Sequence, residues 1–77
     1  MRLVDAVYAR IEDLAKERRL SMNALANLCG VPHPTIATMK RSTTVKLSTI
    51  YGICAGLDLS LQEFFNSPRF NKDIITD

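Results

Sequence analysis

The sequence predicts an all-α domain built from five short helices, and three observations favour this fold class. Apolar residues recur at intervals of three and four, which is the period of an amphipathic helix. Glycine, proline and polar clusters interrupt these stretches often enough to separate five helices. Residues 43–45 have strand propensity, but no other segment offers them a partner strand, so we expect a loop there.

Size and composition narrow the possibilities further. A chain of 77 residues with 47% hydrophobic and 23% charged residues fits one globular domain rather than a disordered chain. No apolar run approaches the roughly 20 residues of a membrane-spanning helix. Charged residues from position 5 onwards interrupt any signal peptide. We therefore expect a cytoplasmic protein that has no contact with a membrane.

The first two helices are predicted from their apolar residues and their caps. One apolar stripe predicts a helix over residues 2–18. The stripe consists of Leu3, Val7, Ile11 and Leu14. Ser21 is a good N-cap for a second helix, because a serine hydroxyl can accept a hydrogen bond from the first helical turn. Gly30 can adopt the left-handed conformation that commonly ends a helix.

The third helix follows a proline-rich turn. Each proline disfavours the helical conformation of the residue before it, so we expect His33, which precedes Pro34, to lie outside the helix. Pro34 itself suits the first helical turn, where its missing N–H is harmless. The helix is predicted from Pro34 to position 40 or 41, with Ile36 and Met39 directed towards the core.

Two further helices are expected after a polar loop at residues 42–47. Ser48 is the expected N-cap of the fourth helix, and Gly56 is expected to end it. Ser60 and Glu63 have the spacing of a capping box, in which the two residues bond each other's backbone N–H groups. This spacing predicts a short fifth helix.

The segment after the fifth helix is expected to be a C-terminal tail. Pro68 prevents a simple continuation of the helix. The tail carries three large apolar residues, Phe70, Ile74 and Ile75. We therefore predict a domain over residues 1–66 and a tail over residues 67–77 that packs on the domain or on a dimer partner.

Charge is distributed unevenly along the chain. The whole chain carries a formal charge of +2, but residues 21–57 contain no acidic residue and three basic ones, Lys40, Arg41 and Lys46. A basic cluster without acidic neighbours favours a polyanionic partner such as nucleic acid. Ordinary solubility charges around a loop are the alternative interpretation.

Residues 21–41 have the pattern of a helix-turn-helix unit. Ala26 is small where the next helix must cross, and Gly30 permits a positive φ in the turn. Ile36 and Met39 are spaced to point back into the core. In such a unit the second helix presents its outer face to the major groove of DNA.

The wider sequence resembles the phage repressor and Cro-type helix-turn-helix family over about residues 10–65. The resemblance rests on Leu20-Ser21, Ala24-Leu25-Ala26, Gly30-Val31, Thr35-Ile36, Leu47-Ser48-Thr49-Ile50, Ile53-Cys54-Ala55-Gly56-Leu57 and Leu59-Ser60-Leu61-Gln62-Glu63-Phe64-Phe65, in this order. It implies a compact five-helix, lambda-repressor-like domain that binds double-stranded DNA. It further implies a bacterial or phage transcriptional regulator, of repressor type, that binds a palindromic operator as a homodimer.

The resemblance also implies roles for individual residues. The positions that face base edges in the family are His33, Pro34, Ala37 and Thr38. Thr38 could bond a base edge or touch a thymine methyl group, and Ala37 could touch a thymine methyl group. The residues implied to serve the DNA backbone are Thr35, Lys40, Arg41, Thr43, Lys46 and Ser48.

Departures from the family pattern leave a second function open. Met22 stands where the family often has glutamine, and Pro32 and Pro34 remove two N–H donors at the front of the third helix. A protein-interaction module, or the antitoxin of a toxin–antitoxin pair, would keep the fold with weak or no DNA binding. A protein partner therefore remains an alternative to DNA.

Catalysis and metal binding find little support in the sequence. His33 is the single histidine, and residues 21–57 contain no acidic residue that could orient it as a catalytic base. His33, Cys29 and Cys54 do not form a usual zinc-ligand set. We expect both cysteines to be small core residues, and we expect no enzymatic activity, cofactor or metal.

Overall fold

The computed structural model describes all residues 1–77 and contains no β-strand. Its helices are α1 (Leu3–Glu17), α2 (Met22–Cys29), α3 (His33–Met39), α4 (Leu47–Gly56), α5 (Leu61–Phe65) and the short 3-10 helix η1 (Pro68–Phe70). The predicted all-α fold with five α-helices is confirmed. None of these helices combines the length and hydrophobicity needed to cross a membrane.

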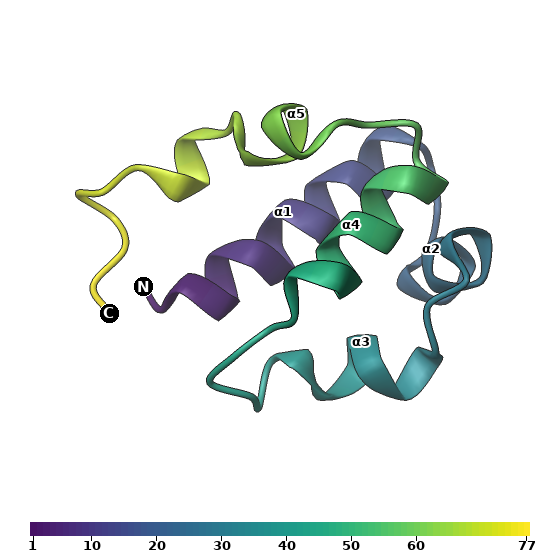
Figure 1. Cartoon of the computed structure of the whole chain (residues 1–77), viewed down its shortest axis with the longest axis horizontal. Helices are drawn as coiled ribbons and strands as arrows, with labels where there is room; N and C mark the ends of the chain where they lie inside the picture. The colour runs from purple at the N-terminus through teal and green to yellow at the C-terminus, as the bar shows by residue number, and fades with distance from the viewer.

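Helices α1 and α4 contribute most of the buried residues, and the other α-helices complete the core. In Figure 1, α4 runs in nearly the same diagonal direction as α1, in front of it and to its lower right, with α5 above the pair, α3 below it and α2 at the right. Fully enclosed side chains come from four helices: Ile11, Leu25, Ile53 and Phe64. Helix α3 adds its two buried residues, Ile36 and Met39, to the same core.

Three predicted capping signals are confirmed. The Ser21 hydroxyl accepts a hydrogen bond from the Ala24 N–H at 3.0 Å, as an N-cap should. Gly30 has φ +66° and ends α2 in the left-handed conformation. Ser60 and Glu63 form the capping box, with both reciprocal bonds at 3.0 Å.

The starts of α3 and α4 differ from the prediction. Helix α3 begins at His33, so the expectation that His33 lies outside the helix is wrong. The Thr35 N–H bonds the Pro32 carbonyl at 3.0 Å, and this turn draws His33 into the first helical turn despite the proline that follows it. Pro34 does lie in the first turn, as predicted.

Ser48 is not the N-cap of α4, and this prediction is also wrong. The N-cap is Lys46, whose backbone is extended and whose carbonyl accepts the Thr49 N–H at 3.0 Å. Val45 is partly buried against the core. Because this packing fixes the chain just before Lys46, the helix starts two positions earlier than a serine cap at position 48 would require.

Gly56 is the last residue of α4, as expected, but packing rather than backbone conformation requires a glycine there. A Cβ atom at this position would lie only 2.6 Å from the Cys29 Cα atom. The left-handed residue after α4 is Asp58, with φ +57°, and the Leu59 N–H then bonds the Cys54 carbonyl at 2.8 Å. Gly56 therefore permits the close approach of α2 and α4.

The C-terminal segment runs along α1 and returns to the N-terminus (Figure 1). The Phe70 ring packs edge-on against Phe65, with ring centroids 5.0 Å apart. The Arg69 guanidinium donates a hydrogen bond to the Asp13 carboxylate at 2.9 Å. The Thr76 N–H donates to the Met1 carbonyl at 3.0 Å. Contacts within one chain thus cover part of the apolar surface of residues 67–77.

Candidate nucleic-acid interface

Helices α2 and α3 form the expected helix-turn-helix unit. The turn closes through the Val31 N–H, which donates to the Ala26 carbonyl at 3.0 Å. Ala26 is 1% exposed, so its small side chain lies in the packed contact of the unit. Ile36 and Met39 fix one face of α3 to the core. The opposite face of α3 is therefore held in a defined orientation and left open to solvent.

This open face carries four exposed residues, His33, Pro34, Ala37 and Thr38. They are the residues that the sequence suggested for contact with base edges. The Thr38 hydroxyl donates a 2.8 Å hydrogen bond to the Pro34 carbonyl one turn earlier. This bond fixes the Thr38 side chain against its own helix and uses its only hydroxyl proton.

The residues suggested for the DNA backbone lie around the C-terminal end of α3 and the N-terminal end of α4. Thr35 is partly buried, whereas Arg41, Thr43 and Ser48 are exposed together with Lys40 and Lys46. The Lys40 ammonium lies 4.7 Å from the centroid of the Tyr8 ring, a cation–π contact that orients it towards α1.

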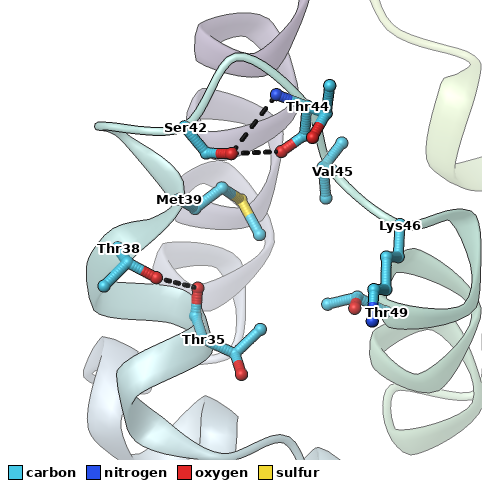
Figure 2. Close-up of a pocket in the computed structure, with 8 residues that line it drawn as sticks. All are labelled: Thr35, Thr38, Met39, Ser42, Thr44, Val45, Lys46 and Thr49. Atoms are coloured by element: carbon cyan, nitrogen blue, oxygen red, sulfur yellow. Dashed lines mark hydrogen bonds between the residues drawn. The ribbon is translucent and has the colours of Figure 1, made fainter.

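A groove separates α3 from the start of α4 (Figure 2). Figure 2 shows Thr35, Thr38 and Met39 on one side and Lys46 and Thr49 on the other. The groove has a volume of about 340 Å³, and its other lining residues are Ser42, Thr44 and Val45. A second hollow of about 230 Å³ continues it past Thr35 and Thr49 towards Gly30 and Gly52.

Hydroxyl groups and one ammonium group therefore dominate the groove. The Ser42 hydroxyl donates to the Thr44 carbonyl at 2.7 Å and so fixes the loop at the rim. Lys46 is the single charged residue in the lining. No acidic side chain takes part, which makes the groove compatible with an anionic group and unfavourable for a cation.

Several arginines outside this region are bonded to their own chain. Arg10 donates to the Phe64 carbonyl at 2.8 Å and to the Glu63 carbonyl at 2.9 Å. These bonds give a hydrogen-bond donor to carbonyl groups in the last turn of α5. Arg18 donates to the Leu57 carbonyl at 3.3 Å. By contrast, the side chains of Arg41 and Lys46 form no hydrogen bond or ion pair within the chain.

Two of the paired arginines shift the pKa values of their carboxylate partners. Hydrogen bonding to Arg2 lowers the pKa of Asp5, and hydrogen bonding to Arg69 lowers the pKa of Asp13. The same contacts raise the pKa of each guanidinium above its ordinary value. These four groups remain charged and mutually neutralised at neutral pH, so they add little positive potential at the surface.

Arg2 and Tyr8 contact Lys40 at the C-terminal end of α3. The sequence alone did not predict that they lie near the helix-turn-helix unit. The Arg2 guanidinium donates to the Lys40 carbonyl at 2.9 Å and to the Asp5 carboxylate at 3.0 Å. Tyr8 lies beneath the Lys40 ammonium. The three-residue spacing of Arg2 and Asp5 could have indicated their ion pair, but no local pattern reports a contact across 38 residues.

Met22 and the cysteines contribute to packing. Met22 is partly buried against the core, so the position where the resemblance suggested a glutamine is used for an apolar contact. Cys54 is buried and Cys29 is partly buried, and both are free thiols whose pKa burial raises. No group of three or more potential metal-ligating side chains comes together anywhere in residues 1–77.

Comparison with known proteins identifies this fold and this unit. The family model of the Cro/C1-type helix-turn-helix DNA-binding domain matches residues 10–68. The chain belongs to this family. It is also similar to the crystal structure of the prophage Lp1 protein 11, with a TM-score of 0.81 and 28% sequence identity. That similarity covers 94% of this chain and 99% of the other. No curated protein matches the sequence.

Proposed function

We propose that this protein is a transcriptional regulator of repressor type that binds a palindromic operator as a homodimer. The observation that carries the proposal is the open face of α3, which is fixed to the core by Ile36 and Met39 and lies in a segment without acidic residues. A rigid helix with one exposed face suits insertion into a major groove, which admits one α-helix. The similarity to a prophage protein is consistent with a phage or mobile-element origin.

The contacts divide into two classes in this proposal. His33, Pro34, Ala37 and Thr38 face the base edges and determine which sequence is bound. The residues that serve the sugar-phosphate backbone are Thr35, Lys40, Arg41, Thr43, Lys46 and Ser48. Arg41 and Lys46 supply the larger electrostatic share, because their side chains have no partner in the chain, whereas the Lys40 ammonium lies against the Tyr8 ring.

The dimensions of the molecule support binding as a pair. The longest axis is 32 Å, whereas two recognition helices in successive major grooves lie about 34 Å apart. Two copies bound to one face of the duplex would therefore be close neighbours. We therefore expect a palindromic site whose half-site centres are about one turn of the DNA duplex apart, which is roughly 10 base pairs.

Selection of bound sites from random duplex DNA tests the proposal. The expected result is enrichment of a palindromic motif, followed by a complex of two chains with one duplex in analytical ultracentrifugation. The motif should be lost in a control selection with Ala37→Glu, which places a carboxylate on the exposed face of α3 and leaves the core unchanged. Failure of the wild-type chain to enrich any motif would overturn the proposal.

A protein partner is the second candidate, and the surface of α4 favours it. Leu47 and Tyr51 are 60% and 61% exposed and lie one helical turn apart. Exposed apolar pairs of this kind often mark protein contacts. An interaction module or an antitoxin would enrich no DNA motif, and a Tyr51→Glu variant would lose its protein partner while remaining folded.

A further inference from the structure

The open face of α3 is nearly devoid of hydrogen-bond donors. Pro34 and Ala37 carry no polar side-chain atom, and Pro34 also lacks a backbone N–H. Thr38 keeps a hydroxyl group, but the hydroxyl proton is donated to the Pro34 carbonyl at 2.8 Å. His33, at the first position of the helix, is the one residue of this face with a free side-chain hydrogen-bond donor.

The three donor-free residues form one continuous surface. Pro34, Ala37 and Thr38 follow the spacing i, i+3, i+4 and so lie on the same side of the helix, and all three are exposed. The Thr38 hydroxyl is turned towards its own helix, where Figure 2 also shows its longer contact with the Thr35 carbonyl. The groups left for an incoming ligand are a pyrrolidine ring, two methyl groups and the remaining acceptor capacity of the Thr38 oxygen, and none of them is a hydrogen-bond donor.

Such a surface discriminates poorly between purines. Guanine presents two acceptors in the major groove, and adenine presents an acceptor beside an amino group, so their recognition relies on side chains that donate hydrogen bonds. Thymine presents a C5-methyl group, which apolar side chains contact. The same methyl group occurs on 5-methylcytosine.

We infer that α3 identifies its DNA site chiefly through pyrimidine 5-methyl groups in the major groove, which Pro34, Ala37 and Thr38 contact. This inference rests on the proposed function and specifies the chemistry that the operator must present. The half-site is then rich in thymines placed opposite these residues, and Thr38 contributes its methyl group rather than its hydroxyl.

Deoxyuridine substitution tests the inference without changing the protein. Each contacted thymine of the selected site is replaced by deoxyuridine, which removes one methyl group and preserves base pairing. Affinity measured by fluorescence anisotropy should fall about four-fold per contacted methyl, the size expected for exposing one buried methyl group. Replacement of thymine–adenine pairs by 5-methylcytosine–guanine pairs should retain more affinity than unmethylated cytosine–guanine pairs, which separates the methyl group from the rest of the base.

A matched pair of variants assigns the role of Thr38. Thr38→Val keeps a methyl group and removes the hydroxyl, and it should bind within about two-fold of the wild type. Thr38→Ser keeps the hydroxyl and removes the methyl, and it should lose about four-fold in affinity. The deoxyuridine effect at the corresponding position should disappear in Thr38→Ser.

The outcomes separate this inference from the proposed function. If the wild type binds its selected site and deoxyuridine has no effect, the inference is wrong and the proposed function stands. The reverse ranking, with Thr38→Ser intact and Thr38→Val impaired, would also overturn it, since the hydroxyl would then read the base. If no site is enriched at all, both fail together.

Discussion

Two groups of basic side chains in this molecule contrast in what they bond. Four arginines donate to carbonyls or carboxylates of their own chain. Arg10 lies in α1, Arg2 and Arg18 cap its two ends, and Arg69 lies in the C-terminal segment. Arg41 and Lys46, beside the open face of α3, have no such partner. The comparison teaches that the tertiary position of an arginine decides whether it stabilises the fold or remains available to a polyanion, since Arg41 is the same type of residue as the four bonded arginines.

The largest effect is expected from the second group. The double substitution Arg41→Gln with Lys46→Gln should weaken binding to the selected DNA about 25-fold per subunit at 0.15 M salt, because each lost phosphate contact costs about five-fold. The free energy of unfolding should change by less than about 0.5 kcal/mol, since neither side chain is bonded within the chain. Fluorescence anisotropy and urea denaturation measure the two quantities, and a large loss of stability would contradict the contrast.

Arg10 represents the first group. Arg10→Gln removes two charge-assisted hydrogen bonds to the last carbonyls of α5, and it should lower the free energy of unfolding by about 1.5 kcal/mol. DNA affinity of the folded variant should remain within about two-fold of the wild type. If DNA affinity falls while stability is unchanged, Arg10 belongs with the residues that we propose to contact DNA phosphates.

Arg2, the N-cap of α1, tests whether a residue outside the helix-turn-helix unit affects the order of α3. Arg2→Gln removes the bond to the Lys40 carbonyl, so the end of α3 becomes less ordered and DNA binding should weaken about five-fold. The slope of log affinity against log salt should stay constant, because Arg2 neutralises Asp5 rather than a phosphate. Lys16→Gln, an exposed charge change on α1, serves as the control. A slope reduced by about one unit would mean that Arg2 contacts DNA directly.

The Asp13–Arg69 pair should have the smallest effect, and that effect depends on pH. Because Arg69 lowers the pKa of Asp13 in the folded state, the pair stabilises the fold above the ordinary aspartate value of about 4. That stabilisation is lost as pH falls through the folded-state pKa of Asp13. Asp13→Asn should therefore cost about 0.5 kcal/mol at pH 7, given the partial exposure of both side chains.

The cost of Asp13→Asn should vanish at strongly acidic pH, where the wild-type carboxylate is itself protonated. Thermal unfolding of both chains between pH 2 and pH 7 provides the measurement. A stability difference that grows on acidification would have the wrong sign for a lowered pKa and would contradict the pairing.

Local signals in the sequence predicted most of the fold. Ser21, Gly30 and the Ser60–Glu63 capping box act on neighbouring backbone groups, so they could be recognised without knowing the tertiary structure. The prediction of Ser48 as the N-cap of α4 was wrong, because packing of the preceding loop, which includes Val45, determines where α4 starts. Local preference yields to tertiary contacts in such cases.

The candidate site was predictable only in part, for the same reason. The residues on the outer face of α3 follow from helical periodicity once Ile36 and Met39 are assigned to the core. The Arg2 bond to Lys40 and the Tyr8 contact with the Lys40 ammonium join residues more than 30 positions apart. The sequence left open whether Thr38 bonds a base edge or touches a thymine methyl group. The hydrogen bond from its hydroxyl to the Pro34 carbonyl favours the methyl contact, and that bond is visible only in the structure.

The salt dependence of binding tests the central contrast most directly. With three or four phosphates neutralised by each of two subunits, the slope of log affinity against log salt should be on the order of −5 to −7 for the selected operator. The Arg41→Gln and Lys46→Gln double variant should reduce the magnitude of this slope by roughly three to four units, whereas Arg10→Gln should leave it unchanged. A wild-type slope near zero, or the same slope in the double variant, would contradict the assignment of Arg41 and Lys46 to DNA phosphates.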